Sequence, residues 1–239
     1  MEVWKRWMRE WVRVYGPLPQ DYLVIDCETS GLSLNEDPVL QLGWCHVVNQ
    51  EIVENGSTIL NWTNHPDVDP AWLKRRLEWT RDKVTKRGKP YNWTMGKLAT
   101  GEDPVDALSG FFHRVLSWLP SVIVGHNTIR FDSPMLSAHL RRFLHYSYEL
   151  PAESIMDTGC FIKAAQMDWM PDPMEPPWKF ASRVLHAPCR IKWSLDGYAV
   201  PVLGLDKKYN LDTSLAHTAA YDSRVAALVL ETMRELAQV

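Results

Sequence analysis

The stretch YLVIDCE, residues 22–28, decides the fold of this 239-residue chain. It begins with four apolar residues and ends with Asp26 and Glu28 on either side of Cys27. A short apolar run of this kind predicts a buried strand. Side chains two apart on a strand point to the same face, so Asp26 and Glu28 are expected to be neighbours at the carboxyl end of this strand.

The segments that follow this strand predict an α/β sheet of mixed direction. Two more strands are expected at 39–48 and 51–60, joined by a tight turn at Asn49-Gln50. Strands and helices then alternate, with strands at 121–127 and 154–158 and helices at 104–119, 133–146, 159–167 and 218–237. This order predicts a central sheet with helices on its faces. Residues 170–212, rich in Pro, Trp and basic residues, give no clear assignment.

The composition indicates one globular domain that is not a polycation. Hydrophobic residues make up 46% of the chain and charged residues 23%, and the net charge is −3, so any contact with nucleic acid has to come from a local patch. The four cysteines form no Cys-x-x-Cys pair, which predicts free thiols in a reducing compartment. No apolar run reaches the ~18 residues of a membrane span. We therefore expect a soluble cytoplasmic protein without a membrane partner.

The N-terminal stretch VWKRWMREWVRVY, residues 3–15, has helical apolar spacing, with apolar residues at 4, 7, 8, 11, 12 and 15. The favoured interpretation is a helix packed on the core of the domain. The alternative is a docking helix for a protein partner or a membrane surface.

A second Trp-containing stretch, residues 72–93, holds eight Lys or Arg against two acids, with four interleaved aromatics, Trp72, Trp79, Tyr91 and Trp93. Basic groups contact phosphates and aromatic rings stack on bases, which suits a single nucleic-acid strand. A solvated helix whose Trp side chains pack inward fits equally well. If the stretch binds, changing Lys86, Arg87 and Lys89 weakens binding and flattens its salt dependence. A weaker candidate is Arg190-Lys192-Trp193.

The adjacent carboxylates of Asp26 and Glu28 repel each other unless a cation neutralises them, and Mg²⁺ or Mn²⁺ prefers such oxygen ligands. A solvated Glu28 is the alternative. Asp132 follows the 121–127 strand at a strand-to-helix junction, where it is either a site residue or the N-cap of the next helix. Asp157 ends the strand at 154–158, where a helix cap is expected and a ligand role stays open.

The stretch HTAAYDSR, residues 217–224, adds a histidine and an acid at the head of the last helix. Asp222 is expected one turn into that helix, with His217 just before it. Taken alone, a single His is usually structural and a single Asp on a helix is usually solvated.

Taken in order, VIDCETSGL, VGHNTIRFDSPML and HTAAYDSRVAALVL resemble the three motifs of the DEDDh-type 3′→5′ exonuclease family. This superfamily contains the proofreading exonucleases and ribonuclease T. The resemblance rests on Asp26 and Glu28, then Asp132, then His217 and Asp222. It covers roughly residues 20–60, 104–165 and 209–237.

The resemblance implies a ribonuclease H-like fold, with a central five-stranded mixed sheet flanked by helices. We expect one exonuclease domain over residues 1–239. An appended helix at 1–18 and family-variable segments at 61–103 and 166–208 complete it.

The resemblance also implies a mechanism with two Mg²⁺ ions, which Mn²⁺ can replace. Asp26, Glu28, Asp132 and Asp222 are the implied metal ligands, and His217 is the implied general base. Thr29 and Leu32 are expected against the terminal nucleotide, Leu32 as a wedge. Asn127 and Phe131 are also expected to contact substrate.

The expected reaction removes nucleoside 5′-monophosphates from the 3′ end of single-stranded DNA or a frayed duplex. An exoribonuclease or oligoribonuclease is the first alternative, because the catalytic set is the same. A non-catalytic binding module is a weaker one. We favour a stand-alone nuclease, or one tethered by the N-terminal Trp-rich helix, and the sequence leaves the oligomeric state open.

Overall fold

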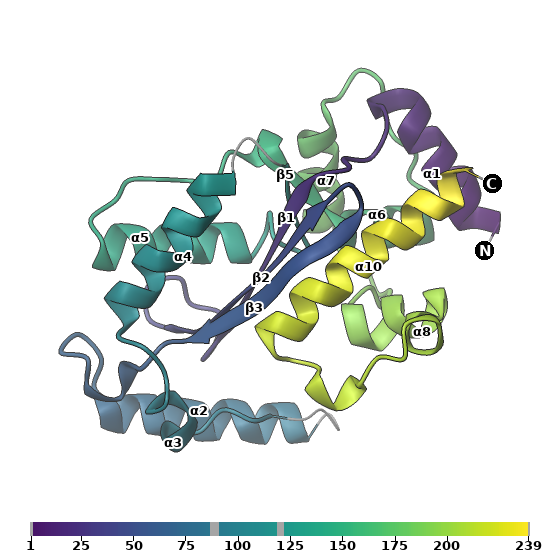
Figure 1. The fold of residues 1–239 in the computed structure, drawn as a ribbon. Helices are drawn as coiled ribbons and strands as arrows, with labels where there is room; N and C mark the ends of the chain where they lie inside the picture. Colours follow the sequence, from purple (N-terminus) through teal and green to yellow (C-terminus); the bar gives the residue numbers. More distant parts are fainter. Residues whose placement is uncertain (1, 87–90, 119–121, 239) are drawn as a thin grey trace.

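The computed structural model describes residues 2–86, 91–118 and 122–238 and is built on one five-stranded sheet (Figure 1). The strand order is β3-β2-β1-β4-β5. The strands are β1 (Tyr22–Thr29), β2 (Val39–Val48), β3 (Glu51–Ile59), β4 (Val122–Gly125) and β5 (Ile155–Asp157). β1 pairs antiparallel with β2 and parallel with β4, so the sheet is mixed. The predicted ribonuclease H-like α/β fold is confirmed.

The tight turn between β2 and β3 is also confirmed. Asn49 and Gln50 have φ angles of 49° and 69°, the left-handed conformation that a two-residue hairpin turn requires. The Oδ1 atom of Asp21 accepts a hydrogen bond of 2.7 Å from the amide of Asn49, which fixes the turn against the start of β1.

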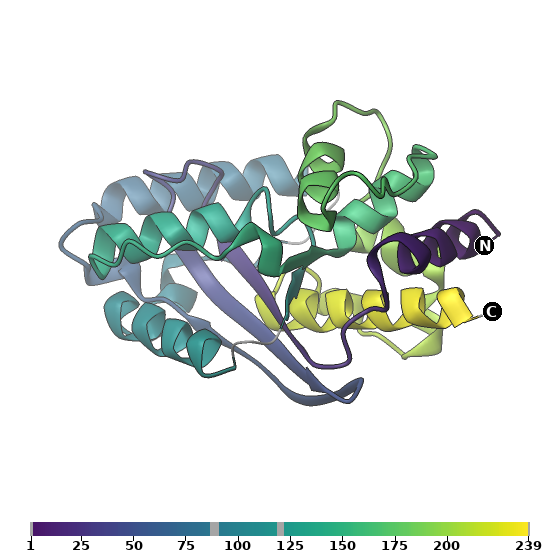
Figure 2. The same ribbon diagram turned by 90° about the horizontal axis from the view of Figure 1, so that it is seen from above.

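Alternate residues of β1 face two different cores. Leu23 and Ile25 pack with α4 (Pro104–Trp118) and α5 (Asp132–Phe143). Tyr22 and Val24 pack on the other face with α6 (Thr158–Gln166), α7 (Pro177–His186) and α10 (Ala219–Gln238). Figure 2 shows α10 crossing one face of the sheet, while α4 and α5 lie on the opposite side. By this alternation Asp26 and Glu28 belong to the face that α10 covers.

Helix α1 (Glu2–Tyr15) lies beside α10 and α6 (Figure 1). Its apolar face is buried in the chain's own core through Trp4, Trp7, Met8 and Trp11. The indole Nε1 of Trp7 donates a 2.7 Å hydrogen bond to the carbonyl of Trp169. The interpretation of this stretch as a packed helix is confirmed. The apolar side chains that a docking helix would offer to a partner are buried in the chain's own core.

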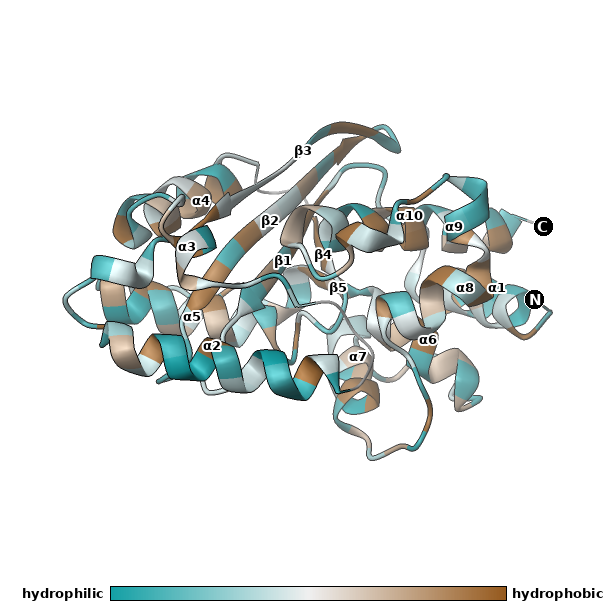
Figure 3. Ribbon diagram, turned by 90° about the horizontal axis from the view of Figure 1, so that it is seen from below, coloured by the Kyte–Doolittle hydropathy of each residue, from teal (hydrophilic) through white to brown (hydrophobic). Residues whose placement is uncertain are grey.

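The two segments expected to vary within the family form peripheral helices. The first contains α2 (Pro70–Thr85) and α3 (Met95–Leu98), and the second contains α7, α8 (Val200–Leu203) and α9 (Leu205–Lys208). A π-helical turn spans Leu195–Ala199, and 3₁₀ turns span Trp62–Asn64, Ala152–Ser154 and Thr213–Leu215. In Figure 3, α2 runs along one edge of the molecule and is coloured largely hydrophilic. Within the described residues, no helix is both long and apolar enough to cross a membrane.

Candidate active site

The first acids of the candidate site lie where β1 leaves the centre of the sheet. Asp26 pairs with Gly43 of β2, and both Asp26 and Glu28 are half-buried. An irregularity in the β1–β2 pairing follows directly, between Glu28 and Thr29. The two carboxylates therefore stand at the carboxyl end of a central strand, as the sequence predicts.

Asp132 is tied to the same strand from the opposite side. It is the first residue of α5 and is buried, and its carboxylate accepts hydrogen bonds from the amide of Cys27 (2.8 Å) and the hydroxyl of Thr128 (3.2 Å). The N-cap of α5 is Phe131, and no side chain caps the helix. The alternative that Asp132 is an N-cap is therefore wrong, and its side chain holds α5 against β1 between the two other acids.

Asp157 is a helix cap, as expected, and its carboxylate also stabilises the turn before Asp132. Its carboxylate accepts bonds from the amides of Gly159 (2.9 Å) and Cys160 (3.3 Å) at the start of α6. It also accepts bonds from the amides of Asn127 (2.8 Å) and Ile129 (3.1 Å). Because all four donors are backbone amides, Asp157 fixes the backbone conformation of the loop that positions Asp132.

The last helix is held close to β2 at its first turn. The amide of Ala219 donates a 3.0 Å hydrogen bond to the side chain of Gln41. A Cβ atom on Gly43 would lie 2.2 Å from the carbonyl oxygen of Ala219, so only glycine allows this approach. Asp222 follows one turn later and is buried, 8% exposed. His217 precedes the helix in the left-handed region, with φ of 65°.

Five carboxylates, one more than the sequence predicts, gather where these segments meet. They are Asp26, Glu28, Asp132, Asp222 and Asp196 of the π-helical turn. Burial, reinforced by the other four acids, raises the pKa of Asp26 well above its usual value. Burial and the charges of Glu28, Asp196 and Asp132 raise the pKa of Asp222 in the same way, against the amide of His217, which lowers it.

Burial also raises the pKa of Asp132 to about 7, although the hydrogen bonds from Cys27 and Thr128 act in the opposite direction. Acids whose pKa values are raised together by burial and mutual repulsion are typical of a site that binds cations or moves protons.

Asp196 is the site residue that the sequence analysis missed. Its Oδ2 atom lies 3.9 Å from Nε2 of His217. It comes from the segment 166–208, where neither periodicity nor a motif marks it. No local signal relates an isolated Asp in a Pro- and Trp-rich stretch to a histidine 21 residues later.

Three of these side chains could share one metal ion. One ligand atom each from Glu28, His217 and Asp222 lie within 4.8 Å of one another. The Oδ1 atom of Asp222 is buried and has no hydrogen-bond donor among the described residues. Carboxylate oxygens and an imidazole nitrogen suit a divalent cation, so the donor set fits a metal ion. This trio includes His217, which the sequence analysis assigned as a base, and does not include Asp26 or Asp132.

An open cleft of about 540 Å³ extends from these residues. Thr29 and Leu32 line it together with Glu28 and His217, and the Leu32 side chain is 79% exposed. Asn127 and Phe131 are not among the described residues that line this cleft. Asn127 adopts φ of 68° in the turn held by Asp157, and Phe131 packs against the core formed with α4 and α5.

Some residues of the basic stretch 72–93 fit the strand-binding interpretation, and others fit the interpretation of a helix whose Trp side chains pack inward. Trp93 is buried and Trp79 is 46% exposed, and both line the cleft. Lys86 is exposed, and Arg87 and Lys89 lie outside the described residues. In the weaker candidate, Arg190 and Lys192 are exposed, while the carbonyl of Trp193 lies 2.8 Å from Nε2 of the histidine after β4, His126.

No family model and no curated protein sequence matches the chain. In fold, as a five-stranded mixed sheet flanked by helices, the chain matches solved structures of ribonuclease H-like exonucleases. Among them is exonuclease I of E. coli in complex with a dA16 oligonucleotide, at 16% identity and a TM-score of 0.56, covering 92% of this chain and 42% of that chain.

Two further structures of exonuclease I give similar values. One, of the enzyme described for its processivity, has 14% identity, a TM-score of 0.57 and coverage of 90% and 41%. The other, a zinc-bound complex of the E. coli enzyme with single-stranded DNA, has 15% identity, a TM-score of 0.56 and coverage of 92% and 42%. The chain thus spans about two fifths of exonuclease I, and the likeness is one of fold.

Proposed function

We propose that the chain is a metal-dependent 3′→5′ exonuclease that releases nucleoside 5′-monophosphates from single-stranded DNA. The observation that carries this proposal is the meeting of Asp26, Glu28, Asp132 and Asp222 with His217 at the end of one strand. These residues come from three distant segments, each of which carries one of the motifs quoted above. Residues 1–239 form a single exonuclease domain under this proposal.

The acids hold divalent cations, Mg²⁺ in the first instance and Mn²⁺ as a substitute. Such ions lower the pKa of a water nucleophile and stabilise charge on the leaving oxygen. Glu28 and Asp222 would form one ligand set, and Asp26, which interacts with both of them and with Asp132, would extend it. Asp132 keeps its position through the amide of Cys27, so its orientation does not depend on the ion.

His217 takes the proton of the attacking water. An imidazole loses its proton near neutral pH, so it can act as a general base there. Its partial exposure and its place before α10 leave the ring at the mouth of the cleft, next to Glu28. Asp196, 3.9 Å from the ring, stabilises the imidazolium that forms.

Single-stranded DNA is favoured because the similar exonuclease I structures hold DNA oligonucleotides. The alternative is RNA, since the same carboxylates would cleave either backbone. Contacts to the 2′-hydroxyl distinguish the two substrates, and only a direct comparison measures them.

The test uses 5′-labelled single-stranded DNA, duplex DNA and RNA of one sequence, incubated with protein and Mg²⁺. We expect a ladder that shortens from the 3′ end, fastest on single-stranded DNA. Asp222→Asn is expected to abolish the ladder, and His217→Ala to slow it by about 10²- to 10⁴-fold.

The matched control is Asp67→Asn, because Asp67 is an exposed acid that belongs neither to the cluster nor to the lining of the cleft. It should cleave like the parent. If Asp222→Asn cleaved at the parental rate, or if no substrate were cut with Mg²⁺ or Mn²⁺, the exonuclease proposal would be wrong.

A further inference from the structure

The cleft beside the carboxylates has a second wall, made by α2. On one side it is lined by Glu28, Thr29 and Leu32 of the first motif and by His217. On the other side it is lined by five α2 residues, Arg76, Trp79, Thr80, Lys83 and Val84, and by Tyr91, Asn92 and Trp93 after the helix. Its volume of about 540 Å³ lies within the range of pockets that hold nucleotide-sized ligands.

This wall is fixed to the loop after β1. The guanidinium of Arg76 donates two hydrogen bonds, of 2.6 and 2.7 Å, to the buried carboxylate of Asp37. The same carboxylate accepts bonds from the hydroxyl of Ser30 and the amide of Ser33, both 2.9 Å. Thr80 donates a 2.7 Å bond to the carbonyl of Ser30. The position of α2 relative to Thr29 and Leu32 is therefore set by buried polar contacts.

Trp79 presents a partly exposed aromatic ring at this wall, with two cations packed against it. It is 46% exposed, although most tryptophans are highly buried. Arg76 lies 4.5 Å and the ammonium of Lys83 lies 3.5 Å from the centre of its ring. Arg76 is fixed by Asp37, whereas Lys83 has no carboxylate within ion-pair distance among the described residues. The Lys83 ammonium can therefore move to another anion without breaking an ion pair.

The wall made by α2 carries positive charge, whereas the carboxylates beside the cleft carry negative charge. Glu28 lines the cleft and belongs to the cluster of five carboxylates beside it, and an approaching phosphodiester is repelled by whichever of them are not neutralised. Arg76 and Lys83 place two cations on the facing side of the same cleft. An aromatic ring next to a cation is the combination that binds one base and its phosphate in single-strand sites.

We infer that Trp79 and Lys83 form a nucleotide-binding wall, in which a base packs on the Trp79 ring and Lys83 contacts the adjacent phosphate. The ligand is a single nucleic-acid strand whose 3′ end lies at the carboxylates, and in this respect the inference rests on the proposed function. Trp79 and Lys83 determine how tightly the strand is held, and the carboxylates determine whether it is cut.

The test measures binding, so that it is independent of cleavage. The probe is 5′-fluorescein-labelled dT20, followed by anisotropy with Mg²⁺ and the Asp222→Asn protein as parent. We expect Trp79→Ala to raise Kd about tenfold and Trp79→Phe to restore most of the affinity. Lys83→Gln should lower the slope of log Kd against log salt by about 0.7, the share of one phosphate contact on a single strand.

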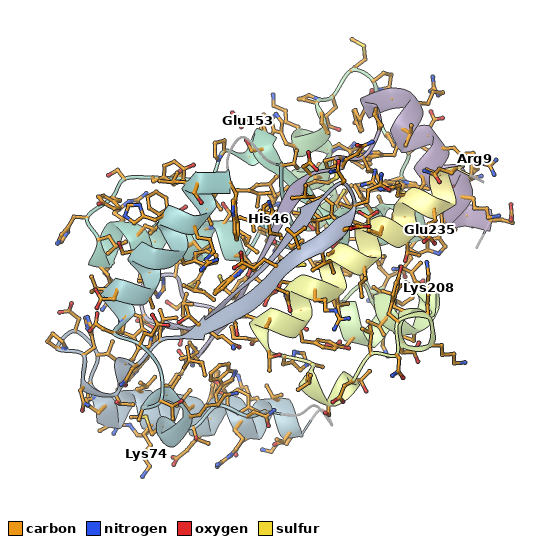
Figure 4. All side chains as sticks on the ribbon, viewed as in Figure 1. Arg9, His46, Lys74, Glu153, Lys208 and Glu235 are labelled. Carbon is orange, nitrogen blue, oxygen red and sulfur yellow. The ribbon has the colours of Figure 1, made fainter. Side chains whose placement is uncertain are left out.

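The matched control is Lys74→Gln. Lys74 belongs to the same helix but lines a separate cavity of about 250 Å³, and its side chain extends away from the body of the molecule in Figure 4. It should leave both Kd and salt slope unchanged. Equal Kd values for Trp79→Ala and the parent, or the same loss for Lys74→Gln as for Lys83→Gln, would overturn the inference.

The two proposals fail in different ways. If the wild-type protein cuts DNA but Trp79→Ala binds dT20 as tightly as the parent, the inference of a nucleotide-binding wall is wrong. The proposal of an exonuclease is then unaffected. If Trp79→Ala weakens binding but the wild-type protein cuts nothing, the wall stands as part of a binding module.

Discussion

Helices α1 and α2 carry the same kinds of side chain and use them in opposite ways. Both mix tryptophan with lysine and arginine. In α1, Trp4, Trp7 and Trp11 recur at spacings of three and four and are buried against α6 and α10. In α2, that stripe belongs to Leu73 and Leu77, and Trp79 remains exposed at the cleft.

The difference shows that spacing, and not composition, decides whether an aromatic residue stabilises the fold or is open to a ligand. A tryptophan on the stripe at every third or fourth position is removed from water by the fold itself. One that lies off the stripe remains available. The predictions below test this contrast between α1 and α2, and they begin with the largest effect.

Trp7→Ala should lower the free energy of unfolding by about 3–5 kcal/mol, because it leaves a cavity in the core. Trp7 is 0% exposed and also loses its hydrogen bond to Trp169. Chemical denaturation measures the effect. Trp79→Ala should cost less than about 1 kcal/mol in the same experiment, as an exposed residue does. Equal losses for the two variants would break the contrast, and Trp7→Phe gives a milder variant if Trp7→Ala does not fold.

The end of the sheet that faces α2 should be destabilised by its own charge until a cation binds. Asp132, whose pKa burial raises to about 7 from a usual 3.8, contributes stability that is fully present below 3.8 and lost as the pH rises through about 7. The raised pKa values of Asp26 and Asp222 act in the same direction. The metal-free protein should therefore be more stable at pH 5 than at pH 8.

Mg²⁺ at a hundred times its Kd should add about 2.7 kcal/mol at pH 8. This corresponds to a rise in melting temperature of roughly 5–11 °C for a chain of this size. The rise should be smaller at pH 5, and Asp222→Asn should reduce it at both pH values. A rise that is the same at pH 5 and pH 8, or in the variant, would contradict binding at these carboxylates.

Arg76→Gln should cost about 1–3 kcal/mol of stability, because it leaves the buried Asp37 carboxylate without its charged partner. Asp37 is 1% exposed. Burial acts to raise the pKa of Asp37, but Arg76, Ser33 and Ser30 together lower it. Stability from this pair is thus present at neutral pH and lost in acid. Urea unfolding at pH 7 and pH 3.5 should show a wild-type advantage at pH 7 that shrinks at pH 3.5.

The smallest effect on stability is expected from exposed cations on the two helices. Arg9 on α1 and Lys83 on α2 are both exposed. The Arg9 side chain extends outward in Figure 4. Arg9→Gln and Lys83→Gln should each change the unfolding free energy by less than about 0.5 kcal/mol. Only Lys83→Gln should change the binding of dT20. Weaker binding in Arg9→Gln would mean that bulk charge, and not the α2 wall, holds the strand.

Much of the fold could be predicted because its signals are local. The apolar run before Asp26, the turn at Asn49-Gln50 and the periodic last helix each determine their own conformation. The packing of α1 could be predicted only as the better of two interpretations, because an amphipathic helix has the same pattern whether it covers its own core or a partner's.

The site divides in the same way. Asp26 and Glu28 could be placed from strand alternation, and Asp132 and Asp222 from motifs with characteristic spacing. Asp196 could not, because it lies in the short π-helical turn Leu195–Ala199, which is too short to show a period of its own. The exposure of Trp79 and the burial of Trp93 likewise depend on how α2 and the chain after it pack on the sheet.

Because α10 docks on β2 at Gly43 and Gln41, the candidate site is completed late in the synthesis of the chain. A ribosome adds Asp222 196 residues after Asp26 (222 − 26), which takes roughly 10–40 s at about 5–20 residues per second. Throughout that interval the growing chain carries the acids of β1 without the acid and the histidine that face them. Under the proposed function, the protein cannot degrade nucleic acid around the ribosome until its last helix has emerged and docked.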